Sequence, residues 1–292
     1  MSEKLSELTE EYFNKDNYVI QTETVGNREK WAVIYASSHN IYSPENEYGF
    51  IKDIVKKDNY EWFKTRIPFA SKHIFIRDIS KRFYSFGINN KLNNFEKIAE
   101  FLKPELEGYK IITIGSSAGG TAAIILGNLL NAEYIFAFSP IIRSYKEDYP
   151  QEKVEEDLKN NKIFDITSTI EKMQTPIFYM YPCESSFDIY TVNLIKNCQN
   201  IKFLPIKSPI HGIPVNKRIL KTIIKQNLSE LHKLYQYKYN DCIHEYLFVK
   251  KHFGIKMFAA RLFDFARKYP HFFLKKEFYN IINEIFKKED TK

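Results

Sequence analysis

One short segment of the chain carries the residue types that nucleophilic catalysis requires. It reads Gly115-Ser-Ser-Ala-Gly-Gly120, and Ser117, unlike Ser116, has a glycine two positions away on both sides. A β-branched apolar run precedes the segment and an Ala- and Leu-rich run follows it, which predicts a strand, a tight turn and a helix. Small residues let the backbone approach such a turn, and the helix N-terminus favours developing negative charge. We therefore predict that Ser117 is a nucleophile and that the N–H of Ala118 is an oxyanion donor.

A serine nucleophile needs a general base, and His211 is the candidate. It follows an apolar run at residues 201–206, the last predicted strand of the sheet, and Gly212 stands beside it. An imidazole at this place could take the serine proton and return it to a leaving group. Taken alone, His211 would be an ordinary loop histidine. His39 is the one rival, because it also follows a predicted strand.

The acid that orients the histidine is expected after the preceding strand, predicted at residues 175–181. Asp188 is our choice, because a run with helical apolar spacing follows it. Glu184 lies nearer the end of the strand and is the alternative. Either carboxylate, considered singly, could be a solvated loop residue.

A second oxyanion donor is expected from the loop after the strand predicted at residues 30–36. Ser37 and Ser38 are the candidates, and we assign Ser37, although this serine-rich loop could equally be a plain turn. No His-Gly-Gly-Gly type motif is present, which distinguishes the site from those of common lipases and esterases. The three cysteines lack metal-ligand spacing, and no zinc or haem signature is seen, so no metal is expected.

The elements that would position these residues alternate along the chain. Further strands are predicted near residues 18–21, 73–77, 111–114 and 132–138, and further helices over 49–62, 93–106 and 215–228. Strands alternating with helices predict an α/β fold with a mostly parallel sheet and right-handed crossovers. Residues 1–20 are expected to be a loose lead-in with a short strand, and residues 141–174 a polar, helical insertion placed like a lid.

The order Ser117, Asp188, His211 on alternating strands and helices resembles the α/β-hydrolase superfamily over about residues 30–230. The Gly-Ser-Ser-x-Gly-Gly elbow, with Ser139-Pro140 after the next strand, is similar to a divergent bacterial group linked to surface polysaccharides. That group includes capsule O-acetyltransferases with a Ser-Asp-His triad. The resemblance implies a mostly parallel sheet flanked by helices, and a serine acylated from a donor such as acetyl-CoA for transfer to a sugar hydroxyl. No CoA-binding motif is readable, and hydrolysis would need no cofactor.

The charge is unevenly distributed and divides the chain into two parts. Residues 231–292 hold 13 Lys and Arg against 7 Asp and Glu, whereas residues 1–230 hold 30 against 29. We expect a catalytic domain over 1–230 and a basic helical extension over 231–292. In the extension, the run Phe253–Phe286 has helical apolar spacing and Pro270 splits it into two helices. The pair could pack on the main body, or it could attach to an anionic membrane surface or an acidic glycan. Nucleic-acid binding is not expected.

The function predicted is acyl transfer by a serine nucleophile, in an esterase or O-acyltransferase acting on a bacterial surface polysaccharide or its precursor. Two alternatives stay open: a non-catalytic binding or assembly protein with the same fold, and a hydrolase of a peptide or thioester bond. The first ten residues have no apolar core, and no stretch approaches the ~18 apolar residues of a membrane span. The expected location is therefore the cytoplasm, with the basic extension as a candidate attachment to the inner membrane.

Overall fold

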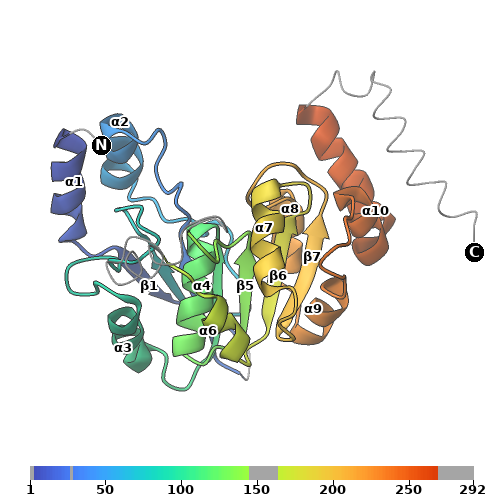
Figure 1. Ribbon diagram of the computed structural model, residues 1–292, viewed down its shortest axis with the longest axis horizontal. Coiled ribbons are helices and arrows are strands. Elements are labelled where there is room, and N and C mark those ends of the chain that lie inside the picture. The colour runs from blue at the N-terminus through green and yellow to red at the C-terminus, as the bar shows by residue number, and fades with distance from the viewer. Residues whose placement is uncertain (1–2, 27–28, 145–163, 269–292) are drawn as a thin grey trace, which may run out of the picture. The chain divides into compact units, whose positions relative to one another are not determined.

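The centre of the chain is a seven-stranded sheet in the computed structural model, which describes residues 3–26, 29–144 and 164–268 (Figure 1). The strand order is β1-β3-β2-β4-β5-β6-β7. Strand β1 is antiparallel to β3, and every other neighbouring pair is parallel. The strands are β1 (Tyr18–Thr22), β2 (Trp31–Ala36), β3 (Lys72–Ile76), β4 (Lys110–Ser116), β5 (Tyr134–Phe138), β6 (Ile177–Pro182) and β7 (Ile201–Ile206). This arrangement confirms the predicted α/β-hydrolase-like sheet.

Helices connect the strands and supply the covering layers. They are α1 (Glu3–Phe13), α2 (Glu47–Phe50), the π-helical segment η1 (Ile51–Lys56), α3 (Phe95–Glu105), α4 (Ala118–Leu129), α6 (Thr167–Lys172), α7 (Ser186–Ile195), α8 (Lys217–Ile223), α9 (Leu228–Leu234) and α10 (Glu245–Lys268). Helices α3, α4, α6 and α7 lie over one face of the sheet (Figure 1). Two apolar clusters fill that interface: one joins α3 and α4 to β2 and β3, and the other joins α6 and α7 to β5, β6 and β7.

The opposite face of the sheet is also covered. The ring of Phe178 in β6 contacts Tyr235 just after α9, with centroids 5.2 Å apart. The ring of Trp62, from the segment between η1 and β3, stacks on Phe138 of β5 at 5.7 Å. Because both faces are buried, β5 is apolar at every position, as expected for a central parallel strand.

Three predicted elements differ from the structure. The N-terminal residues form α1 instead of a loose lead-in, because Leu5 packs into a cluster with Ile41 and Phe50. The helix predicted over 49–62 ends at Lys56 in η1. The helix predicted over 215–228 is two helices, α8 and α9, whose N-termini are capped by the side chains of Asn216 and Asn227.

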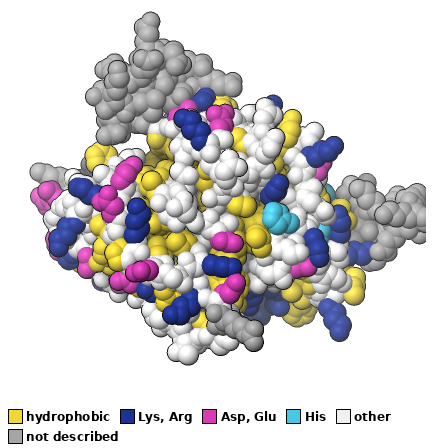
Figure 2. All heavy atoms as spheres, turned by 90° about the horizontal axis from the view of Figure 1, so that it is seen from below, with side chains coloured by type: hydrophobic (Ala, Val, Ile, Leu, Met, Phe, Trp, Pro, Cys, Tyr) yellow, Lys and Arg dark blue, Asp and Glu magenta, His cyan; other side chains and the backbone are white. Residues whose placement is uncertain are grey.

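The chain divides into two compact units, Met1–Asn240 and Asp241–Lys292, where the sequence suggests a boundary at residue 230. In the described part of the second unit, α10 is interrupted by Gly254, whose φ of 77° is left-handed. The second helix predicted after Pro270 and the middle of the 141–174 insertion lie outside the described residues. None of the helices described combines the length and apolar character needed to cross a membrane. On the face shown in Figure 2, basic and acidic side chains are interspersed.

Candidate active site

Ser117 occupies a strained turn between β4 and α4. Its φ of 54° and ψ of −123° lie outside the regions that non-glycine residues ordinarily adopt. The turn is held by the Ser117 N–H, which donates to the carbonyl of Phe138 at 2.9 Å, and by the Ser117 carbonyl, which accepts from Thr121 at 3.1 Å. The structure thus projects the serine from the carboxyl end of β4, as in a nucleophile elbow.

The glycines around Ser117 are required by the close approach of backbone. A Cβ on Gly115 would lie 2.0 Å from the carbonyl oxygen of Gly119. A Cβ on Gly119 would lie 2.3 Å from the carbonyl oxygen of Ala36 and 2.7 Å from that of Ser37. The elbow therefore packs directly against the end of β2 and the loop that follows it.

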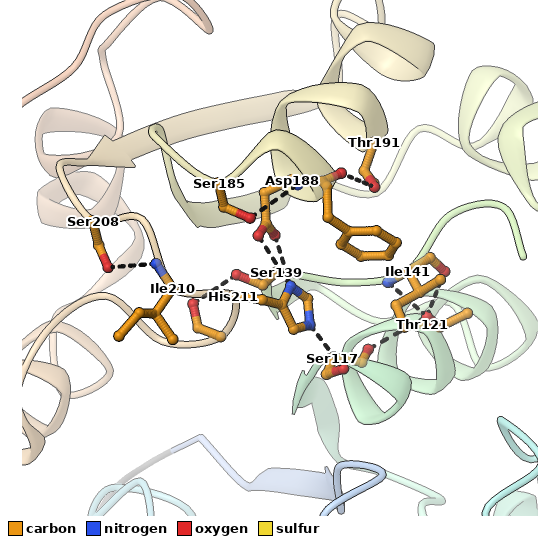
Figure 3. A network of polar contacts seen from close by, with 12 residues as sticks. Ser117, Thr121, Ser139, Ile141, Ser185, Asp188, Thr191, Ser208, Ile210 and His211 are labelled. Carbon is orange, nitrogen blue, oxygen red and sulfur yellow. Dashed lines mark hydrogen bonds and ion pairs between the residues drawn. The ribbon is translucent and has the colours of Figure 1, made fainter. Parts of the chain in front are cut away.

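Three side chains from distant parts of the sequence form one hydrogen-bonded chain (Figure 3). The His211 Nε2 lies 3.0 Å from the Ser117 Oγ, and the His211 Nδ1 lies 3.0 and 3.1 Å from the two carboxylate oxygens of Asp188. Asp188 is completely buried, whereas the His211 side chain is 33% exposed. The carboxylate is thus shut off from solvent, whereas the imidazole and the serine are partly exposed.

The acid in this chain is Asp188 and not the alternative, Glu184. Asp188 lies in the first turn of α7, where its N–H donates to the hydroxyl of the N-cap residue Ser185. The Glu184 carboxylate lies 3.7 Å from the Lys207 ammonium at the surface. The rival histidine, His39, lies 3.8 Å from the Glu45 carboxylate and stacks on Phe83.

The buried Ser139, for which the sequence predicts no contact with the catalytic residues, holds the loop carrying His211. The Ser139 hydroxyl donates to the carbonyl of Gly212 at 2.7 Å. Ser139 has no solvent exposure, and both its φ of 44° and the Gly212 φ of 117° are left-handed. The bond ties the end of β5 to the residue after the imidazole (Figure 3). The Ser-Pro pair directly after a strand was the sequence signal for this contact.

The two predicted oxyanion donors differ in availability. Ala118 is the first residue of α4, so its N–H has no hydrogen-bond acceptor within the helix. The N–H of Ser37 instead donates to the Ile76 carbonyl at 3.0 Å, which extends the pairing of β2 with β3. The Ser37 N–H is therefore not free to bind an oxyanion, so a donor at Ser37 would have to be its side chain. Its hydroxyl oxygen accepts from the Glu61 N–H at 3.4 Å and keeps its own proton.

The described ends of the 141–174 insertion lie side by side. Arg143 and Asp165 form an antiparallel bridge, and the Arg143 Nε donates to the Asp165 carboxylate at 2.8 Å. The Ser144 N–H donates to the Phe164 carbonyl at 3.0 Å. The ring of Phe164 also contacts Phe83, with centroids 5.2 Å apart. The insertion thus leaves and re-enters the domain at one place.

Among the residues described, no group of three or more His, Cys, Asp or Glu side chains could hold a metal ion. No protein-family model matches the sequence. No curated protein matches it significantly.

Solved structures similar to this chain share little sequence with it. A capsule O-acetyltransferase of Neisseria meningitidis serogroup A is 17% identical at a TM-score of 0.47, covering 72% of this chain and 91% of its own. MenH from S. aureus is 12% identical at 0.46, covering 76% and 100%. The peroxisomal α/β-hydrolase Lpx1 from Saccharomyces cerevisiae is 10% identical at 0.45, covering 86% and 90%.

Proposed function

We propose that this protein is a serine acyl-transfer enzyme, an esterase or O-acyltransferase, in which Ser117, His211 and Asp188 act as a catalytic triad. The observation that carries the proposal is the continuous hydrogen-bonded chain from a strained serine to a fully buried carboxylate. A scaffold protein has no need of all three groups in this geometry, and this favours an enzyme over a binding or assembly protein.

In the first half of the reaction, the Ser117 Oγ attacks the carbonyl carbon of an ester or thioester. The His211 Nε2 accepts the hydroxyl proton and then gives it to the departing alcohol or thiol as the carbonyl–heteroatom bond breaks. Asp188 accepts from the Nδ1–H, so the tautomer that presents the Nε2 lone pair to the serine is favoured. The product of this half is an acyl-Ser117.

The tetrahedral intermediate needs donors for its oxyanion. The Ala118 N–H, at the start of α4, is the first donor in the proposed mechanism. The second is the Ser37 hydroxyl, since its oxygen already accepts from the Glu61 N–H and its proton stays available. A hydroxyl in this role takes the place of the backbone N–H that Ser37 commits to Ile76.

In the second half, an acceptor hydroxyl attacks the acyl-serine while His211 takes its proton and returns it to the Ser117 Oγ. Water as acceptor gives a carboxylic acid, and a sugar hydroxyl gives a new ester. We place the acceptor among bacterial surface polysaccharides or their precursors on the resemblance of the elbow sequence. Acetyl-CoA would then be the acyl donor, as a second substrate.

Labelling with a fluorophosphonate tests this function directly. We expect covalent labelling of the full-length protein, none in Ser117→Ala, and labelling slowed by at least about 100-fold in His211→Ala. Ser116→Ala is the matched control, because Ser116 precedes the turn within β4 and should label normally. An unlabelled wild-type protein, or equal labelling of Ser117→Ala, would overturn the proposal.

A second measurement separates transfer from hydrolysis. Unlabelled wild-type protein and Ser117→Ala are each incubated with acetyl-CoA, with and without an oligosaccharide, and release of free CoA is compared with the appearance of acetylated sugar. Transfer requires acetylated sugar that depends on Ser117. Free CoA and acetate alone would identify a hydrolase.

A further inference from the structure

The loop after β2 that carries Ser37 lies against the nucleophile turn. The missing Cβ of Gly119 leaves just enough room for the carbonyl oxygens of Ala36 and Ser37. Small displacements of this loop would therefore change the position of the Ser37 hydroxyl relative to Ser117. The contacts that fix this loop therefore influence the rate of any reaction at Ser117, because they set the position of the Ser37 hydroxyl.

One acidic residue far away in the sequence binds this loop at three points. The Glu61 carboxylate accepts from the N–H and from the hydroxyl of Ser38, both at 2.7 Å through separate oxygens. The Glu61 N–H donates to the Ser37 hydroxyl at 3.4 Å. Two short hydrogen bonds to one carboxylate are a charge-assisted, geometrically specific contact.

The residue that follows Glu61 locks the same segment to the sheet. The Trp62 indole N–H donates to the Ala36 carbonyl at 3.2 Å, and its ring stacks on Phe138. Trp62 has a φ of 71°, which is costly for so bulky a residue and persists only where surrounding contacts impose it. The conformation that brings Glu61 to Ser38 is therefore specifically maintained.

The buried surroundings destabilise the ionised form of the Glu61 carboxyl unless it accepts hydrogen bonds. Burial raises the pKa of the Glu61 carboxyl, and the two hydrogen bonds from Ser38 act in the opposite direction. From the other side, the Tyr84 hydroxyl donates to the Ser37 carbonyl at 2.8 Å. Glu61 thus belongs to a set of hydrogen bonds in which, among the residues described, the Ser37 hydroxyl oxygen accepts from the Glu61 N–H and its proton is not engaged by this set.

We propose that Glu61 is a positioning residue that holds the Ser37–Ser38 loop so that the Ser37 hydroxyl is oriented toward the oxyanion formed at Ser117. The proposal rests on the proposed serine chemistry and adds a residue to it. Glu61 touches no reacting atom and acts through Ser37 and Ser38.

The test measures kcat and KM with p-nitrophenyl acetate for the full chain. Glu61→Ala should lower kcat by about 10- to 100-fold with KM changed by less than about 3-fold, because an oxyanion donor acts mainly in the transition state. Glu61→Gln should recover most of kcat, because its amide oxygen can still accept from Ser38. Glu29→Ala, which removes a surface partner of Lys110, is the matched control and should match the wild type.

A double-variant cycle distinguishes positioning from general damage. If Glu61 acts through Ser37, the variant Glu61→Ala/Ser37→Ala should be no slower than Ser37→Ala, whereas independent effects would multiply. Should Glu61→Ala fail to fold, Ser38→Ala carries the test, since it removes one of the two short bonds and should lower kcat several-fold.

The proposed function would stay intact if the wild type turns over p-nitrophenyl acetate and a separate sample of it reacts with the fluorophosphonate. In that case, an unchanged kcat in Glu61→Ala, or in Ser38→Ala where that variant carries the test, would overturn this inference. Multiplying effects in the double variant would overturn it as well. Loss of labelling and of turnover in the wild type would instead overturn the proposed function.

Discussion

The imidazole of His211 is held by both oxygens of Asp188, at 3.0 and 3.1 Å from its Nδ1, and Asp188 is sealed from solvent. The carboxylate reaches this place because the Ser185 cap starts α7 three residues before it, which turns Asp188 inward. The orientation of the His211 imidazole is therefore set by the beginning of a helix.

Asp188→Asn should leave the fold intact and lower kcat for p-nitrophenyl acetate by about 10³- to 10⁴-fold. The amide can donate a proton to Nδ1 and so favours the tautomer whose Nε2 carries hydrogen and cannot accept from Ser117. Glu184→Gln is the control, since it touches only the surface ion pair with Lys207 and should keep full activity. Comparable losses in both variants would remove Asp188 from the mechanism.

Ser139→Ala should lower kcat by about 10-fold and the free energy of unfolding by about 1–2 kcal/mol. The change leaves the Gly212 carbonyl without the 2.7 Å hydrogen bond that holds the His211 loop. Steady-state kinetics and urea unfolding measure the two effects. Ser208→Ala is the comparison variant in the same loop: the half-buried Ser208 hydroxyl accepts only a longer 3.3 Å bond from the Ile210 N–H, so both effects should be smaller. A kcat unchanged in Ser139→Ala would show that the loop is fixed by other contacts.

Gly119→Ala should destabilise the protein by about 3 kcal/mol or more, because its Cβ would lie 2.3 Å from the Ala36 carbonyl oxygen. Backbone cannot move away as a flexible side chain would. Gly26→Ala is the matched control, since its Cβ would meet nothing within 4 Å. Urea unfolding of the two variants should differ clearly, and equal stabilities would mean that the elbow and β2 are farther apart than described.

Stability should fall as the pH is lowered from about 7 to about 5, in part because of His73. Burial lowers the pKa of His73 from its ordinary value of 6.5. As the pH falls below 6.5 the unfolded chain binds the proton first, so the contribution is present above that pH and is lost toward acid. The Tyr35 hydroxyl accepts from the Ile67 N–H and lies 3.0 Å from the His73 Nδ1, whereas the His73 Nε2 lies 3.8 Å from the Glu23 carboxylate.

Unfolding free energies at pH 8 and pH 5.5 measure this effect. His73→Asn keeps an acceptor for Tyr35 but cannot take up a proton, so its stability should depend less on pH than that of the wild type. A variant with the same pH dependence would assign the acid sensitivity to other groups.

The sheet and the residues that meet at Ser117 could be predicted because their signals are local. Each lies at the carboxyl end of a strand, where parallel strands of this fold bring their loops to one edge. The two candidate acids, Asp188 and Glu184, can be separated with certainty only when the first residue of α7 is known. No simple sequence pattern specifies that residue. Helix α1 cannot be recognised from composition, because its residues are mostly polar, although Leu5, Leu8 and Tyr12 have helical spacing.

Glu61 could not be recognised from the sequence. It stands 23 residues after Ser38, in a segment predicted to be helical, and no motif links the two. The left-handed backbone at Trp62 is also unexpected for so large a side chain. Such contacts depend on tertiary packing that overrides the local conformational preference of the residues, so they can be identified only in the folded structure.

The bridge between Arg143 and Asp165 has an evolutionary consequence. Because the two stems of the insertion are already joined, the closure entropy depends only weakly on the number of residues between them. Segments of other lengths and compositions could be exchanged between these stems without disturbing β5 or α6. The framework of Ser117, Asp188 and His211, which lies outside the insertion, would keep its hydrogen bonds through such an exchange.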